Sequence, residues 1–167
     1  MLNGYGESPS LGSYGPAVLR VAVGAVFIAH GGQKLFGLWG GGGLTATTTR
    51  FSQLGFEPAY PLAVAVGSVE FFGGILLVAG AFTLIASIAL AIGACAAILK
   101  AHLASGFFLN WPLTPGVGHG YEFHLTLVGA LVCLMLAGPG ALSFDARRAS
   151  HAAAAAAGRA RLRAGTV

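Results

Sequence analysis

Long apolar segments separated by a few short polar stretches dominate the pattern of the chain. The block from Pro61 to Leu103 is almost uninterrupted, and it is about twice as long as the ~20 residues that one membrane crossing needs. The block must therefore fold back once, and AGAFT at 79–83 is the natural turn. The pattern predicts four helices, at about 16–37, 61–80, 84–103 and 121–139.

The four segments favour helices over strands. Alternation of polar and apolar residues, the mark of membrane strands, is missing from them. A helix satisfies its backbone hydrogen bonds internally, as hydrocarbon surroundings require. Small residues on the second helix (Gly67, Gly74) and the third (Ala89, Gly93, Ala97) should let neighbouring backbones approach closely. The expected fold is an all-α, integral membrane four-helix bundle over residues 16–142.

Two connections are long enough to carry structure of their own. In the loop 38–60, apolar or small residues recur at helical spacing, and Gly55 and Pro58 would end a helix; the recurring positions are Leu44, Thr48, Phe51 and Leu54. This pattern predicts a short interfacial helix. The loop 104–120 contains Trp111, a residue typical of the membrane boundary.

Composition supports a membrane protein. Hydrophobic residues make up 56% of the 167 residues and charged residues only 8%, with a mean hydropathy of +0.79. Soluble domains carry roughly 25% charged residues, so this chain could not cover a globule with charge.

The few charges predict the topology. Five arginines lie in the tail 143–167, which places the C-terminus in the cytoplasm by the positive-inside rule. Four crossings then put the N-terminus in the cytoplasm too. Arg20, near the start of the first helix, agrees with this topology, whereas Arg50, in the first outer loop, does not. The polar segment 1–15 has no Lys or Arg, so the first helix is expected to be retained rather than cleaved as a signal. The basic, alanine-rich tail favours anionic lipid or an acidic soluble partner, not nucleic acid.

Ionisable groups gather in the half of the bundle away from that tail. Lys34 and Glu70 fall within helices, where an unpaired charge is costly, so they should face inward and meet. The candidate ligand-binding residues are His30, Gln33, Lys34, Glu70, His102 and His124. Lys100 and Glu122 lie at the same end. Two interpretations stay open: a structural ion pair with interfacial residues, or the polar floor of a ligand pocket.

Metal and nucleophilic chemistry have less support. Four histidines, at 30, 102, 119 and 124, could converge with Glu70 or Glu122 on a metal or haem, but HExxH and CxxCH are absent. Cys95 and Cys133 sit in apolar runs and are interpreted as packing residues. No Ser/His/Asp triad is supported, and no catalytic residue or certain cofactor is assigned.

Three segments, in this order, resemble the motifs of the DoxX family. They are LRVAVGAVFIAHGGQKLFG at 19–37, VEFFGGILLVAGAFT at 69–83, and YEFHLTLVGALVCLMLAGPGALSFDAR at 121–147. The resemblance implies a small four-helix membrane protein. It also implies a link to redox chemistry, because the family is named from a subunit associated with a terminal quinol oxidase, and mycobacterial relatives are described as scaffolds in an oxidoreductase complex. Gln33, Lys34, Glu70 and the GPG at 138–140 match family positions.

The expected function is an accessory or scaffold subunit of a membrane redox or respiratory complex in a bacterial-type inner membrane. Membrane lipids and subunits of that complex are its expected partners, with quinone or lipid as the ligand and no catalytic activity of its own. Two alternatives remain: a quinone-linked oxidoreductase subunit with its own activity, and a small-molecule or proton transporter that uses the Glu70–Lys34 pair.

Overall fold

The computed structural model describes residues 11–164, which form helices and connecting turns without a strand. The α-helices are α1 (Leu11–Phe36), α2 (Gly43–Gln53), α3 (Ala59–Ala79), α4 (Thr83–Ala97), α5 (Glu122–Ala137) and α6 (Phe144–Ala164). Short helical turns are η1 (Leu38–Gly40), the π-helical η2 (Ile98–His102) and η3 (Leu103–Ser105). The expected polar segment 1–15 falls mostly outside the described residues.

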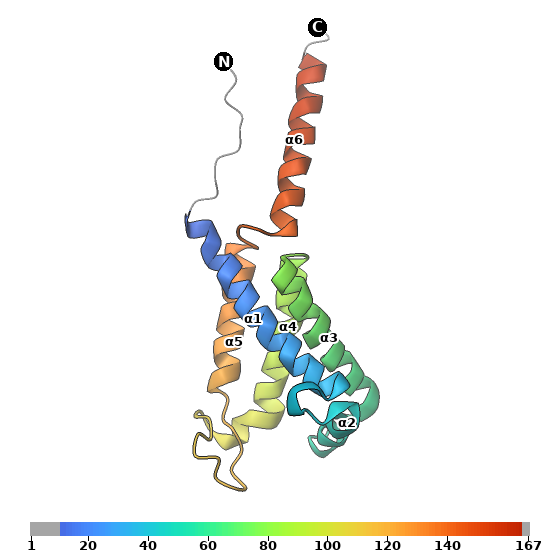
Figure 1. Cartoon of the computed structure of the whole chain (residues 1–167), viewed down its shortest axis with the longest axis vertical. Helices are drawn as coiled ribbons and strands as arrows, with labels where there is room; N and C mark the ends of the chain where they lie inside the picture. The colour runs from blue at the N-terminus through green and yellow to red at the C-terminus, as the bar shows by residue number, and fades with distance from the viewer. Residues whose placement is uncertain (1–10, 165–167) are drawn as a thin grey trace.

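Within residues 11–164, three helical spans are long and apolar enough to cross a membrane: Leu11–Phe36, Ala59–Ala79 and Thr83–Ser105. The last is α4 continued through η2 and η3. The fourth apolar helix, α5, is shorter, with 16 residues. α1 begins at Leu11 instead of Pro16, so Pro16 lies inside the helix, where it removes one backbone hydrogen-bond donor. The molecule is an integral membrane helical bundle in which α1, α3, α4 and α5 lie together (Figure 1).

α1 and α3 cross in the closest contact of the bundle. A Cβ added to Gly24 would lie 2.7 Å from the carbonyl oxygen of Gly74, and one added to Gly74 would lie 2.7 Å from that of Gly24. Because real Cβ atoms do not come that close, only glycine fits at either position. The packing role predicted for Gly74 is therefore confirmed, with Gly24 as its partner.

The second half of the bundle packs through leucines. Leu77 of α3, Leu90 of α4, and Leu131 and Leu134 of α5 are fully buried in one core. The prediction that Gly93 of α4 packs against a neighbouring helix was wrong, because a Cβ added to it would meet nothing within 4 Å. α4 itself carries apolar residues on every face, so the repeat of small residues could not identify which face is buried.

The predicted reversal at 79–83 is present. α3 ends at Ala79, Gly80 adopts a left-handed conformation with φ 66°, and α4 starts at Thr83. The helix expected in the first loop is α2, which is held to α1 by a hydrogen bond from Thr47 Oγ1 to the Lys34 carbonyl at 3.1 Å. α6 extends away from the end of the bundle where α1 begins (Figure 1).

Candidate functional site: an acid–base cluster at one end of the bundle

Lys34 and Glu70 form an ion pair between α1 and α3. Lys34 lies in the last turn of α1, and Glu70 lies near the middle of α3. Their side chains are 30% and 12% exposed. Each charge offsets much of the cost of burying the other, which explains how two ionised groups are tolerated between apolar helices.

The pair leaves hydrogen-bonding capacity unused. Glu70 Oε1 receives the lysine, whereas Glu70 Oε2 is buried without a hydrogen-bond partner. His124 Nδ1 on α5 is also buried without one. Thr83 Oγ1 and Ser87 Oγ of α4 are two further buried atoms without a partner. Buried polar atoms in proteins almost always have partners, so Glu70 Oε2 and His124 Nδ1 each have capacity for a further hydrogen bond.

Histidines surround the pair. The rings of His102 and His124 stack with centroids 4.3 Å apart. His124 also lies within range of the charges of His30 and Lys34, and His30 within range of Lys34 and Glu70. The π-helical turn η2 carries His102 to this position, and its Nδ1 lies 2.9 Å from the His119 carbonyl oxygen. We call His30, Lys34, Glu70, His102 and His124 the acid–base cluster.

Gln33 contacts the turn after α1. Its amide nitrogen donates to the carbonyl of Trp39 at 3.3 Å, so it holds that turn, a role that the sequence did not indicate. Trp39 in turn lies against Gly32.

The remaining polar residues of this end support the long loop. Lys100 is exposed, with its ammonium 5.7 Å from the Phe56 ring centroid. Glu122 accepts the backbone amide of Leu109 at 3.0 Å, and His119 Nδ1 accepts that of Asn110 at 3.2 Å. In the described part of the chain, no three or more His, Cys, Asp or Glu side chains are grouped so that they could hold a metal ion.

Comparison with known proteins agrees with this architecture. The profile of the DoxX family matches residues 15–103, more than half of the chain. The chain belongs to the DoxX family. The matched region includes four members of the acid–base cluster, and His124 lies beyond it.

The DoxX chain also has a curated bacterial relative. "Uncharacterized membrane protein Rv3486" of Mycobacterium tuberculosis is 32% identical over 141 residues, which cover 81% of this chain and 82% of the relative. No solved structure matches the chain. The name of the relative identifies a membrane protein and no activity.

The opposite end of the DoxX bundle, which we call the arginine end, is closed by Arg20 of α1. Its side chain is 2% exposed, and its guanidinium donates to five backbone carbonyls at 2.5–3.1 Å. The acceptors are Leu77, Val78, Pro139, Ala141 and Leu142. The five donors therefore bind carbonyls at the end of α3 and in the turn after α5, where a helix leaves carbonyls without partners of its own; the Leu77 carbonyl also accepts the Gly80 amide at 3.0 Å.

Asp145 completes this end. Its carboxylate accepts the backbone amides of Phe82 and Thr83 at 3.0 and 2.9 Å, and its own amide donates to the Gly80 carbonyl at 3.0 Å. Burial alone would raise the pKa of Asp145, but these amides and nearby Arg148 lower the pKa below its ordinary value. The sequence indicated for Arg20 only agreement with the predicted topology, and it gave Asp145 no structural role.

Proposed function

We propose that this DoxX protein is an accessory or scaffold subunit of a membrane redox or respiratory assembly, and that its acid–base cluster binds a quinone headgroup. The observation that carries the proposal is the pair of unpartnered buried atoms, Glu70 Oε2 and His124 Nδ1. A quinol hydroxyl is a donor suited to the carboxylate, and a quinone carbonyl is an acceptor suited to a protonated imidazole nitrogen.

The proposed topology has four crossings with both ends in the cytoplasm. α5 would be the fourth crossing; its 16 residues span about 24 Å, somewhat less than the ~30 Å hydrocarbon core. α6 carries most of the basic residues, which supports a cytoplasmic location for it. The acid–base cluster then lies in the outer half of a bacterial inner membrane, with α2 at the interface.

The arrangement of the core supports a subunit over a transporter. Between the acid–base cluster and Arg20, the buried core is mostly apolar, with Leu77, Leu90 and Leu131 in it, and Ser87 adds a single buried hydroxyl instead of a chain of polar groups. A proton or solute path would need polar groups there. The polar groups of the cluster serve one end of the bundle, as a headgroup site requires.

The amount of quinone that co-purifies with the full chain tests the proposed ligand. The protein is extracted from its native membrane in mild detergent, and co-purifying quinone is quantified by chromatography with ultraviolet detection. We expect near-stoichiometric quinone in the wild type and at least a tenfold loss in Glu70→Gln. Glu57→Gln, which removes one carboxylate from the loop before α3, is the matched control and should retain quinone. A wild type without quinone, and without a thermal shift on adding short-chain benzoquinone or naphthoquinone, would contradict this binding role.

The subunit role has a separate readout. Native electrophoresis and mass spectrometry of the same preparation should find the protein in a complex with redox subunits. A clean monomer or homo-oligomer under conditions that preserve other respiratory complexes would contradict the role of accessory subunit.

A further inference from the structure

α6 is fixed to the bundle at its base. The hydrogen bonds of Asp145 join it to the turn between α3 and α4, and Ser143 Oγ caps it by accepting the amide of Ala146 at 3.1 Å. From this base α6 extends away from the bundle along its long direction (Figure 1). The helix therefore stands out from the arginine end instead of folding back on the other helices.

The far part of α6 carries a cluster of positive charge. Arg159 and Arg161 are exposed, and the helix contains one acidic residue, Asp145, which is already engaged at the base. Arg159 lies 15 residues after Phe144, about 22 Å along the helix. That distance exceeds the Debye length of about 8 Å at physiological salt, so the far arginines do not sense charges at the base.

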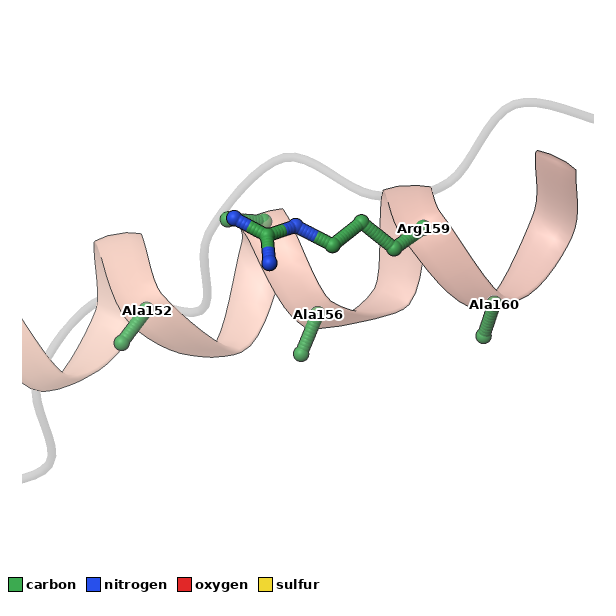
Figure 2. Close-up of a pocket in the computed structure, with 5 residues that line it drawn as sticks. Ala152, Ala156, Arg159 and Ala160 are labelled. Atoms are coloured by element: carbon green, nitrogen blue, oxygen red, sulfur yellow. The ribbon is translucent and has the colours of Figure 1, made fainter.

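Beside the arginines, α6 presents alanines. The methyl groups of Ala152, Ala156 and Ala160 point to one side of the helix, and Arg159 runs along another side (Figure 2). Together with Ala155 these residues line a shallow groove. Methyl groups let a second helix approach closely, and the flanking guanidinium favours carboxylates on that helix.

We propose that α6 is a docking arm for an acidic helix of a soluble protein. A membrane surface fits less well, because interfacial helices insert several large apolar side chains, whereas the middle of α6 offers alanines and its far part has a single large apolar residue, Leu162. A second copy of α6 fits less well because its arginines would repel those of the first. This proposal is independent of the quinone site.

Binding of a defined probe tests the docking arm. The full chain is placed in phosphatidylcholine nanodiscs, and a fluorescent helical peptide with glutamates flanking an alanine face is titrated by anisotropy. We expect saturable, salt-sensitive binding that weakens about tenfold in the double variant Arg159→Gln with Arg161→Gln. The control removes two exposed charges at the other end, Arg50→Gln with Lys100→Gln, and should bind as the wild type does.

A second measurement distinguishes an acidic helix from lipid or a second copy of the chain as the partner of α6. A fluorophore on Ala157→Cys, in a Cys95→Ala and Cys133→Ala background, reports contact with spin-labelled lipid by quenching. Docking of an acidic helix predicts no quenching in neutral or phosphatidylglycerol-containing nanodiscs. Quenching in anionic nanodiscs, self-association of labelled chains without peptide, or peptide binding that is unchanged by the arginine variant would each overturn the proposal.

Discussion

The carboxylate of Asp145 on α6 accepts the backbone amide of Thr83 on α4 at 2.9 Å. This contact links the base of the last helix to the first turn of α4, 62 residues earlier in the chain. Because the first amides of a helix have no partner within it, a carboxylate at this point both satisfies them and stabilises the positive end of the helix dipole.

Asp145 should make stability depend on acidic pH. Its folded-state pKa lies below the ordinary value, so the ionised carboxylate stabilises the fold fully above about pH 4, and this contribution is lost as pH falls below that value through the lowered pKa. Thermal melts from pH 3 to 7 should show a smaller decline at low pH for Asp145→Asn than for the wild type. At neutral pH, Asp145→Ala should cost about 1 kcal/mol. An identical low-pH decline in wild type and Asp145→Asn would show that other carboxyls cause it.

Arg20 should be the most sensitive polar position of the bundle. Arg20→Met would remove five hydrogen bonds to backbone carbonyls, of which, within the described chain, only that of Leu77 also accepts another amide, from Gly80, and should cost about 3 kcal/mol or more. Arg20→Lys keeps the charge but loses the planar five-donor geometry, and should also destabilise. Melting in detergent measures both. Arg50→Met, at an exposed position, is the control and should change little; a similar small effect for Arg20→Met would contradict the closing role of the guanidinium.

Two alanine substitutions should separate the packed helix face from the open one. Gly74→Ala would push against the backbone of Gly24 and should destabilise by at least 1–3 kcal/mol, roughly the cost of overpacking. Gly93→Ala meets open space and should be neutral or stabilise by up to about 1 kcal/mol, because alanine favours helices over glycine. The comparison requires only melting temperatures of the two variants. Equal changes in melting temperature for Gly74→Ala and Gly93→Ala would mean that α1 and α3 do not cross at Gly24 and Gly74.

The sequence pattern was sufficient for the four apolar helices and for the ion pair, but it did not establish the helix α6. Apolar length predicted the reversal at 79–83, and the depth of Lys34 and Glu70 in their helices required them to meet. Arg20 could not be understood the same way, because its partners are backbone carbonyls that leave no trace in side-chain patterns. The GPG at 138–140 and Asp145 were visible as motif positions, but their contact with Arg20 and α4 depends on three-dimensional proximity.

The histidines show a second limit of sequence reasoning. His102 and His124 were predicted to share one end, but their stacking depends on the π-helical turn η2, which shifts the register of the last residues of the span. A pattern read at 3.6 residues per turn does not anticipate such a turn. Gln33 shows the converse, since its position on the same face as His30 did not reveal that its amide would bind the following loop.

The most direct test of the acid–base cluster is a double-mutant cycle on its ion pair. Glu70→Ala alone leaves Lys34 buried without its partner and should destabilise by about 3 kcal/mol or more. The double variant Glu70→Ala with Lys34→Met removes both charges and should recover most of that loss in thermal melts. Equal losses in the single and double variants would mean that the two residues do not interact within the bundle, and would contradict the account of this site.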